Sequence, residues 1–357
     1  MTRQDFRKSA GPGRGDVTTL APRAEAVQRA VAHAHAALPP SFDSRRDGAV
    51  ALVDPRAAGL QDPIQVTATV GISTKVKIAI AMGLHETVAT DLVIGAAHDV
   101  LATGAQPQTF QHYHSCGELD ERIAHQLSSG IAEGCRQAQC AYVGGTTTEL
   151  PGVYETGEYG LAGVCMGSGE RTWLLPRPDL AEGDVLLGLA SSGAHAHGFT
   201  LIRRIVSSQE IGYRDPAPFH PSLSLGQALL TPTRCYVPQV LTVLRETNAV
   251  KGIAVVGEGG LTGGMSEALP PALAARIDLA SWRMPAVFHW LRQTGNLGAS
   301  EMLGSFNCGI GTVLMVDKLR TVSVLKTLRE MGEKPLAIGT LVLRASGDPV
   351  RYSGTLA

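Results

Sequence analysis

The sequence predicts a mixed α/β (α+β) protein with two domains. The chain has 357 residues, whereas a usual domain has roughly 100 to 200. Strand-like and helix-like segments alternate along both halves of the chain. A polar segment with two prolines, residues 171–183, separates the halves as a domain boundary would. We therefore expect an arm over residues 1–22, one domain over 23–170 and a second over 171–357.

The first half carries these elements in order. Residues 1–22 mix Gly, Pro, Ser and charges without a period, which is typical of a mobile arm. Helix-forming residues fill Ala24–Ala37, and Pro39 and Pro40 end that helix. Hydrophobic periodicity then predicts strands over 65–70, 109–114, 140–144 and 160–166, and helices over 76–82, 91–103 and 118–139.

The second half repeats the alternation of strands and helices. A Gly-rich turn follows residue 256, and short helices are expected near Pro285 and Glu301. The other predicted elements are strands over 184–190, 252–256, 310–316 and 336–343, and helices over 198–206, 224–245 and 319–331.

Composition and charge exclude several classes of protein. Lys and Arg number 31 against 32 Asp and Glu, so the net charge of −1 gives no field that attracts nucleic acid or an anionic membrane. The six cysteines form no C-x-x-C pair, which favours reduced thiols over a zinc ribbon or a disulfide scaffold. The first twenty residues lack the apolar run of a signal peptide, and no apolar stretch of about 18 residues is present. We expect a cytoplasmic protein that binds a small-molecule substrate and neither nucleic acid nor membrane.

Six loop motifs occur in an order and spacing that resemble one enzyme family. The family is aminoimidazole ribonucleotide (AIR) synthetase, the phosphoribosylformylglycinamidine cyclo-ligase of purine synthesis, and the resemblance runs from about residue 64 to 343. The motifs that carry it are Val70–Lys75, Asp91–Val93 with His98–Asp99, Gly144–Gly152, Ser191–His195, Pro232–Arg234 and Phe306–Gly309.

The resemblance implies an architecture and a chemistry. Family members have two α/β domains, dimerise through the sheet of the N-terminal domain, and bind ATP and substrate between the domains. They phosphorylate an amide oxygen with ATP and magnesium, and a nearby nitrogen then closes an imidazole ring. By this resemblance we expect a homodimer. The positions that match the family's contacts are Lys75, Ser191, Ser192, His195, Arg234 and Asn307 for the substrate, and Thr74 and Asp91 for the cofactor.

Several positions depart from the family's pattern. Val70 and Thr146 stand where the family has an Asp and a Glu, and His112 stands where an Asp is expected. Magnesium requires oxygen ligands, and neither valine nor threonine supplies the charge of a carboxylate. The family implies ATP and magnesium as cofactors, and these departures predict that their use is impaired or lost.

A group of histidines takes the place of the missing acids. His112 and His114 are two positions apart in a predicted strand, so both side chains point to one face, and His98–Asp99 is expected nearby. His112, His114 and Asp99 are candidate ligands of a transition metal. Alternatively, the histidines fill a polar cavity or carry out acid–base catalysis near neutral pH. The candidate catalytic residues are His98, Asp99, His112 and His195.

Three functions remain open from the sequence. The first is a diverged family enzyme that cyclises or dehydrates a nucleotide-like or amide-bearing small molecule in a specialised pathway. The second is the ATP-dependent purine cyclo-ligase itself, with unusual ligands. The third is a non-catalytic binding protein or partner subunit.

Overall fold

The structure is a computed structural model that describes residues 42–43, 52–53 and 59–356. The predicted arm and the helix predicted over Ala24–Ala37 lie outside the described residues. Two short strands, β1 (Phe42–Asp43) and β2 (Leu52–Val53), pair with each other. No helix of the described part is both long and apolar enough to cross a membrane.

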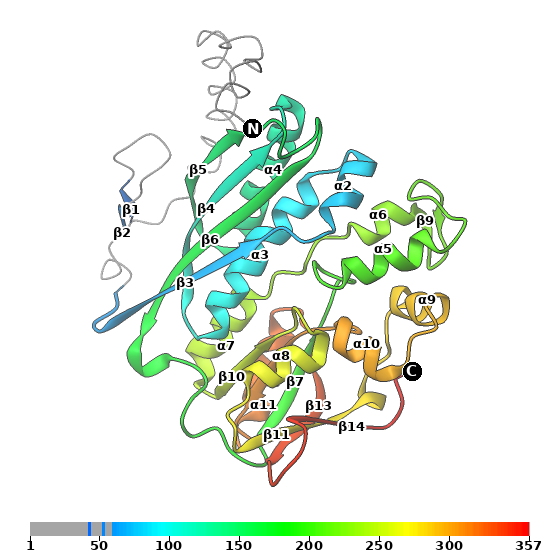
Figure 1. The fold of residues 1–357 in the computed structure, drawn as a ribbon. Helices are drawn as coiled ribbons and strands as arrows, with labels where there is room; N and C mark the ends of the chain where they lie inside the picture. The colour runs from blue at the N-terminus through cyan, green and yellow to red at the C-terminus, as the bar shows by residue number, and fades with distance from the viewer. Residues whose placement is uncertain (1–41, 44–51, 54–58, 357) are drawn as a thin grey trace, which may run out of the picture.

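The first half forms a four-stranded sheet with two long helices on one face. Its strands, in spatial order, are β3 (Pro63–Gly71), β6 (Tyr159–Glu170), β4 (Gln106–Cys116) and β5 (Ala141–Glu149). Helices α3 (Glu86–Ala102) and α4 (Glu121–Ala138) lie against the sheet, and α2 (Val76–Met82) precedes them (Figure 1).

Close packing of α3 against α4 depends on two glycines of α4. A Cβ at Gly130 would lie 2.1 Å from the Glu86 carbonyl oxygen, and one at Gly134 would lie 2.7 Å from Val93. Such distances are too short for any side chain, so glycine lets the helices approach. At its N-terminus, α4 is capped by Asp120, whose carboxylate accepts the backbone N–H groups of Arg122 and Ile123.

The opposite face of this sheet is partly open to solvent. Thr67 and Thr69 of β3 are exposed, Val164 of β6 is half-buried, and Tyr113 of β4 is 42% exposed. The register pairs Thr69 with Val164 and Tyr113 with Thr146, so these side chains share one face.

The second half is built on a six-stranded sheet. Its strands, in spatial order, are β10 (Val250–Val255), β12 (Ile310–Val316), β7 (Val185–Ala190), β13 (Leu336–Leu343), β11 (Leu273–Asp278) and β14 (Val350–Ser353). Every residue of β12 is buried, as expected of an apolar strand inside a sheet. The remaining elements are α5 (Phe199–Ser207), β8 (Pro216–Ala217), β9 (His220–Ser224), α6 (Leu225–Leu229), α7 (Val237–Thr247), α8 (Gly260–Ala268), α9 (Ala286–Thr294), α10 (Ala299–Ser305) and α11 (Thr321–Glu330).

The two halves meet along α3, which contacts both β10 and α7. Most predicted elements are present, and the bounds predicted for α2, β12 and β13 agree with the structure. The single helix predicted over 224–245 was wrong, because α6 ends at Leu229 and α7 begins at Val237. Pro232 interrupts the helical hydrogen bonds there. Strands β11 and β14 were not predicted, nor was helix α8 in the Gly-rich segment.

Candidate functional site

A cleft of about 980 Å³ lies between the two halves of the molecule. Helix α3 provides one wall through Asp91, Gly95, His98 and Ala102, which recur every three or four residues and therefore share one helix face. Asp99 also lines the cleft beside His98. Of the other predicted site residues, Thr74 and His195 line the cleft.

Lys75 is buried next to the cleft and is held by three acceptors. Its ammonium lies 2.8 Å from the Asp91 carboxylate and donates to the carbonyl oxygens of His195, at 2.8 Å, and Thr231, at 2.9 Å. Burial lowers the pKa of this ammonium, and the Asp91 carboxylate opposes the shift. Two of its N–H groups are used by main-chain carbonyl oxygens, and its charge is paired with Asp91.

The segment between α6 and α7 is fastened to α3 by two backbone donors. The Thr233 N–H donates to Asp91 Oδ1 at 2.6 Å, and the Tyr236 N–H donates to His98 Nε2 at 3.0 Å. His98 therefore carries its own hydrogen on Nδ1. Burial lowers the pKa of His98 to about 3, so the ring is a neutral acceptor at pH 7.

Ser191, Ser192 and Asn307 come together but bond to one another and to the main chain. Ser191 Oγ donates to Asn307 Oδ1 at 2.9 Å, and Asn307 Nδ2 donates to the Gly193 carbonyl at 2.8 Å. Ser192 Oγ donates to the Pro232 carbonyl at 2.6 Å. This network shapes the loop that carries His195, whose Nε2 accepts the Ser192 N–H at 3.2 Å.

Arg234 is held away from the cleft by an ion pair. Its Nη2 lies 2.6 Å from Oε1 of Glu333, a carboxylate that is 2% exposed, and its Nη1 donates to the Ala190 carbonyl at 3.2 Å. Of the predicted substrate contacts, Lys75, Ser191, Ser192, Arg234 and Asn307 form this polar frame beside the cleft and are not among the described residues that line it.

Carboxylates from both halves face the cleft. Asp99 of α3, Glu258 of the Gly-rich loop and Glu267 of α8 all line it and are open to solvent. Although Asp99 is accessible, the surrounding cleft walls and the negative charge of Glu267 raise its pKa to about 6. Asp99 can therefore donate or accept a proton near neutral pH.

Glu267 is a candidate that the sequence analysis missed, because the Gly-rich segment was taken as a turn. In the structure, Gly259 and Gly260 adopt φ values of 75° and 61°, and α8 begins there. The available signal was the spacing of Gly260, Gly264 and Ala268, which are four residues apart and form one small-residue face. A helix predicted from this spacing would have placed Glu267 in its last turn.

His197 also lines the cleft, next to the predicted His195. Burial lowers the pKa of both imidazoles, and for His197 the carboxylates of Asp91 and Glu258 oppose the shift. Both histidines line the cleft, but His195 is only 3% exposed, whereas His197 is open to solvent.

His112 and His114 are placed by β4 under the helices rather than in the cleft. His112 Nδ1 lies 2.9 Å from the Tyr142 hydroxyl, and His114 packs edge-on against Tyr159. Burial lowers the pKa of each to about 4. Among the residues that the structure describes, no three His, Cys, Asp or Glu side chains are grouped to hold a metal ion. The structure therefore does not assemble His112, His114 and Asp99 into such a group.

A magnesium–ATP site can be tested against the same residues. Magnesium is usually bound by one or two carboxylates together with substrate phosphates. Asp91 is already bonded to Lys75 and Thr233, and Asp99 faces Glu267. Val70 lines the cleft without offering a ligand atom, and Thr146 lies on the open sheet face opposite Tyr113. Asp91 is therefore engaged elsewhere, whereas Asp99, Glu258 and Glu267 are the carboxylates open to the cleft.

Comparison with known structures and family models agrees with this architecture. A thiamine-monophosphate kinase from Stenotrophomonas maltophilia has a TM-score of 0.63 at 20% identity, over 92% of this chain and 96% of that chain. The hydrogenase maturation protein HypE of E. coli has a TM-score of 0.63 at 19% identity, over 92% of each chain. PurL of T. maritima, complexed with ADP, has a TM-score of 0.54 at 16% identity, over 96% of this chain and 50% of that chain. At these identities the likeness shows the fold.

Two family models together cover most of the chain. The N-terminal domain of AIR synthase related proteins matches residues 49–168, and the C-terminal domain of the same proteins matches residues 181–349. The chain therefore belongs to the AIR synthase related protein family.

Proposed function

We propose that this protein is a diverged family enzyme that cyclises or dehydrates a nucleotide-like or amide-bearing small molecule in the cleft between its halves, in a specialised biosynthetic pathway. The observation that carries the proposal is that Asp99 and Glu267 both line this cleft, with Glu267 near enough to raise the pKa of Asp99. The cleft volume of about 980 Å³ is suited to a ligand of nucleotide size.

The proposed reaction joins a nitrogen to an amide carbon and releases water. Asp99 in its protonated form donates to the carbonyl oxygen while the nitrogen attacks the carbon. The Glu267 carboxylate accepts a proton from that nitrogen, and the oxygen leaves as water after the second proton transfer. Glu267 supplies that second proton, and the Asp99 acid is regenerated when its carboxylate accepts the second proton of the attacking nitrogen, so atoms balance without an oxidant.

This proposal includes impaired or lost use of magnesium–ATP. The two carboxylates missing at Val70 and Thr146 support it, as does the engagement of Asp91 by Lys75. The family's phosphorylation step would convert the amide oxygen into a better leaving group. Without that phosphorylation step, protonated Asp99 donates a proton to the same amide oxygen and so makes it a better leaving group.

The first experiment is calorimetric titration of the full chain with a non-hydrolysable ATP analogue, with and without magnesium, with metal analysis of the same sample. We expect no magnesium-dependent binding. Tight magnesium-dependent binding, with phosphate release when formylglycinamidine ribonucleotide and ATP are supplied, would return the protein to the ATP-dependent cyclo-ligases.

The second experiment tests turnover itself. Amide-bearing nucleotides are incubated with the protein, and mass spectrometry follows the loss of water from each. We expect Asp99→Asn and Glu267→Gln to lower kcat by about 100-fold or more, the usual size of one acid–base contribution. Ser323→Ala, on the outer helix α11, is the control. Binding without turnover throughout the panel would favour a non-catalytic binding protein instead.

We also propose a homodimer formed through the open face of the four-stranded sheet. Half-buried apolar side chains on β6, Ala162, Val164 and Met166, lie at the centre of this face. Burying them against a second copy would remove them from water.

A further inference from the structure

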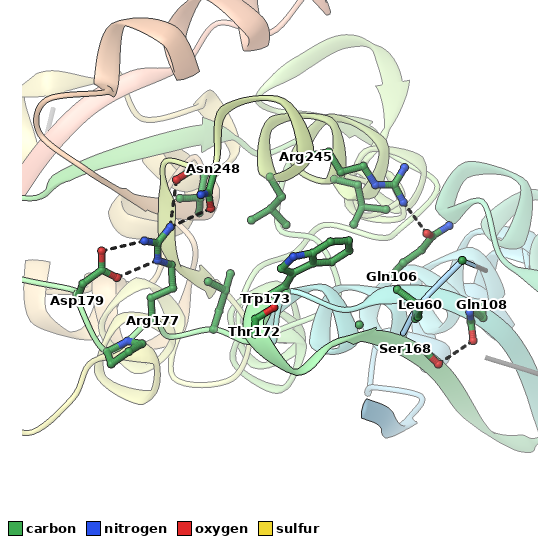
Figure 2. Close-up of a pocket in the computed structure, with 18 residues that line it drawn as sticks. Leu60, Gln106, Gln108, Ser168, Thr172, Trp173, Arg177, Asp179, Arg245 and Asn248 are labelled. Atoms are coloured by element: carbon green, nitrogen blue, oxygen red, sulfur yellow. Dashed lines mark hydrogen bonds and ion pairs between the residues drawn. The ribbon is translucent and has the colours of Figure 1, made fainter. Parts of the chain in front are cut away.

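A second cavity, of about 920 Å³, lies on the other side of the connection between the two halves. The start of β4 and the end of β6 form one wall, and α7 forms the other (Figure 2). The cavity shares only Leu175 with the described lining of the cleft. Its volume lies in the range of small-molecule sites.

One side of this second pocket is an aromatic and aliphatic surface. Trp173 projects into the pocket and is 56% exposed (Figure 2). Leu241 and Leu244 of α7 also line the pocket. Tryptophan is enriched at binding interfaces, because its ring is both apolar and able to form a hydrogen bond. The flat indole offers a stacking surface to an aromatic ring.

The other side carries one cation that is not neutralised. Arg245 donates from Nη2 to the neutral amide oxygen of Gln106 at 2.6 Å, and no described carboxylate lies within ion-pair distance of it. Arg177, in contrast, is paired with Asp179 through two hydrogen bonds of 2.8 and 2.9 Å. The pocket therefore presents the guanidinium of Arg245 as its single unneutralised charge among the described residues.

A buried amide completes the polar side. Gln108 lines the pocket at 8% exposure, and its oxygen accepts the Ser168 hydroxyl at 3.0 Å. The NH₂ group of Gln108 has no partner among the described residues and can donate to a ligand oxygen.

We propose that this second pocket binds a flat aromatic carboxylate, with the ring against Trp173 and the carboxylate on Arg245. A guanidinium matches a carboxylate in a two-bond fork. A single unpaired cation neutralises a monoanion, whereas a phosphate dianion would bring one uncompensated charge. A neutral aromatic ligand would leave the guanidinium without an anion. The ligand class therefore follows from one ring surface and one positive charge.

The test uses the full chain and three matched probes in calorimetric titrations. 2-Naphthoate has both the ring and the charge, 2-naphthamide has the ring alone, and acetate has the charge alone. We expect 2-naphthoate to bind with a dissociation constant at least tenfold below that of 2-naphthamide, and acetate to show no binding. 2-Naphthoate should quench the tryptophan fluorescence of the unaltered protein. It should not quench that of Trp173→Phe, which retains Trp282 and Trp290.

Variants locate the binding. Arg245→Gln and Trp173→Ala should each weaken 2-naphthoate binding about tenfold, and both residues are exposed, so the fold should tolerate the changes. Arg276→Gln removes an exposed arginine of β11 outside the pocket and should leave the affinity unchanged. Failure of 2-naphthoate to bind, equal binding of the amide, or affinity unaffected by Arg245→Gln and Trp173→Ala would overturn the proposal. None of these outcomes bears on catalysis in the cleft.

Discussion

Lys75 and Asp91 place opposite charges where water does not reach, because they are 1% and 5% exposed. A buried ion pair gains little over an apolar pair, but removal of one partner leaves a buried charge that costs about 3–5 kcal/mol. Lys75→Met should lower the free energy of unfolding by that amount in urea denaturation. Lys75→Met with Asp91→Asn should recover part of the loss, since Asn retains an acceptor for the Thr233 N–H.

The matched control is the surface pair of Lys77 and Glu158, whose side chains are 46% and 36% exposed. Lys77→Met should cost less than about 1 kcal/mol, because exposed ion pairs contribute little. If Lys75→Met cost no more than Lys77→Met, the frame beside the cleft would not depend on the ion pair.

Asp99 supports a prediction about pH. Its pKa of about 6 results from the cleft walls and from the charge of Glu267, and the Cys165 thiol of β6 also lies near it. Glu267→Gln removes a negative charge and should therefore lower the pKa of Asp99. Carbon-13 NMR of labelled aspartate between pH 3 and 8 would follow it. Glu258→Gln is the control and should leave it unchanged, whereas an Asp99 that titrates near 4 in the unaltered protein would contradict the assignment.

At the scale of elements, the position of Glu267 depends on how closely α8 packs on β10. A Cβ at Gly264 would lie 2.3 Å from the Val255 carbonyl oxygen, which is backbone and cannot move aside. Gly264→Ala should lower the free energy of unfolding by about 1–3 kcal/mol in urea and reduce turnover by displacing Glu267. Gly304→Ala in α10 is the control, because no atom of residues 59–356 would lie within 4 Å of the added Cβ. It should stabilise the protein by up to about 1 kcal/mol, and equal effects of the two changes would refute the packing argument.

At the scale of the whole molecule, two buried histidines predict weakening by acid. The folded pKa values of His98 and His114, about 3 and about 4, lie below the usual 6.5. The unfolded chain therefore takes up protons below pH 6.5 that the folded protein does not. The stability is present above that pH and is lost as pH falls toward 4, by roughly 1 kcal/mol per pH unit for each ring. Asp99, with its raised pKa, acts in the opposite direction.

Urea unfolding between pH 7 and pH 5 measures this loss. His114 Nε2 is buried and has no hydrogen-bond partner within the described part of the chain, so His114→Phe should be tolerated. The variant should lower the dependence of stability on pH by the contribution of one histidine. His220→Phe, at an exposed position in β9, should leave the slope unchanged. Stability that stayed constant over this range in the unaltered protein would contradict the prediction.

The dimer is also a prediction for the whole molecule. Sedimentation velocity should find two copies of the unaltered chain, and Val164→Arg should give a monomer because it places a charge at the centre of the open sheet face. Val322→Arg, at a position 79% exposed on α11, is the control and should remain dimeric. If the unaltered protein were a monomer, the proposed homodimer would be wrong.

The sequence by itself determined the alternation of strands and helices, because hydrophobic period and proline positions are local properties. Such patterns predicted both the presence and the first and last residues of β12 and α2. The order of the loop motifs also determined the family, since it needs no knowledge of contacts.

Only the tertiary structure decided which polar residues face the cleft and which are used to build it. Lys75, Arg234 and Asn307 have the residue types of substrate contacts. Each donates instead to a residue that lies 44 to 156 positions away, and these bonds hold the three side chains in the frame beside the cleft. Glu267 lies near enough to Asp99 to raise its pKa because α8 and α3 both pack against β10. Charge, burial and hydrogen-bond saturation are properties of pairs brought together by folding, so no single segment of the sequence encodes them.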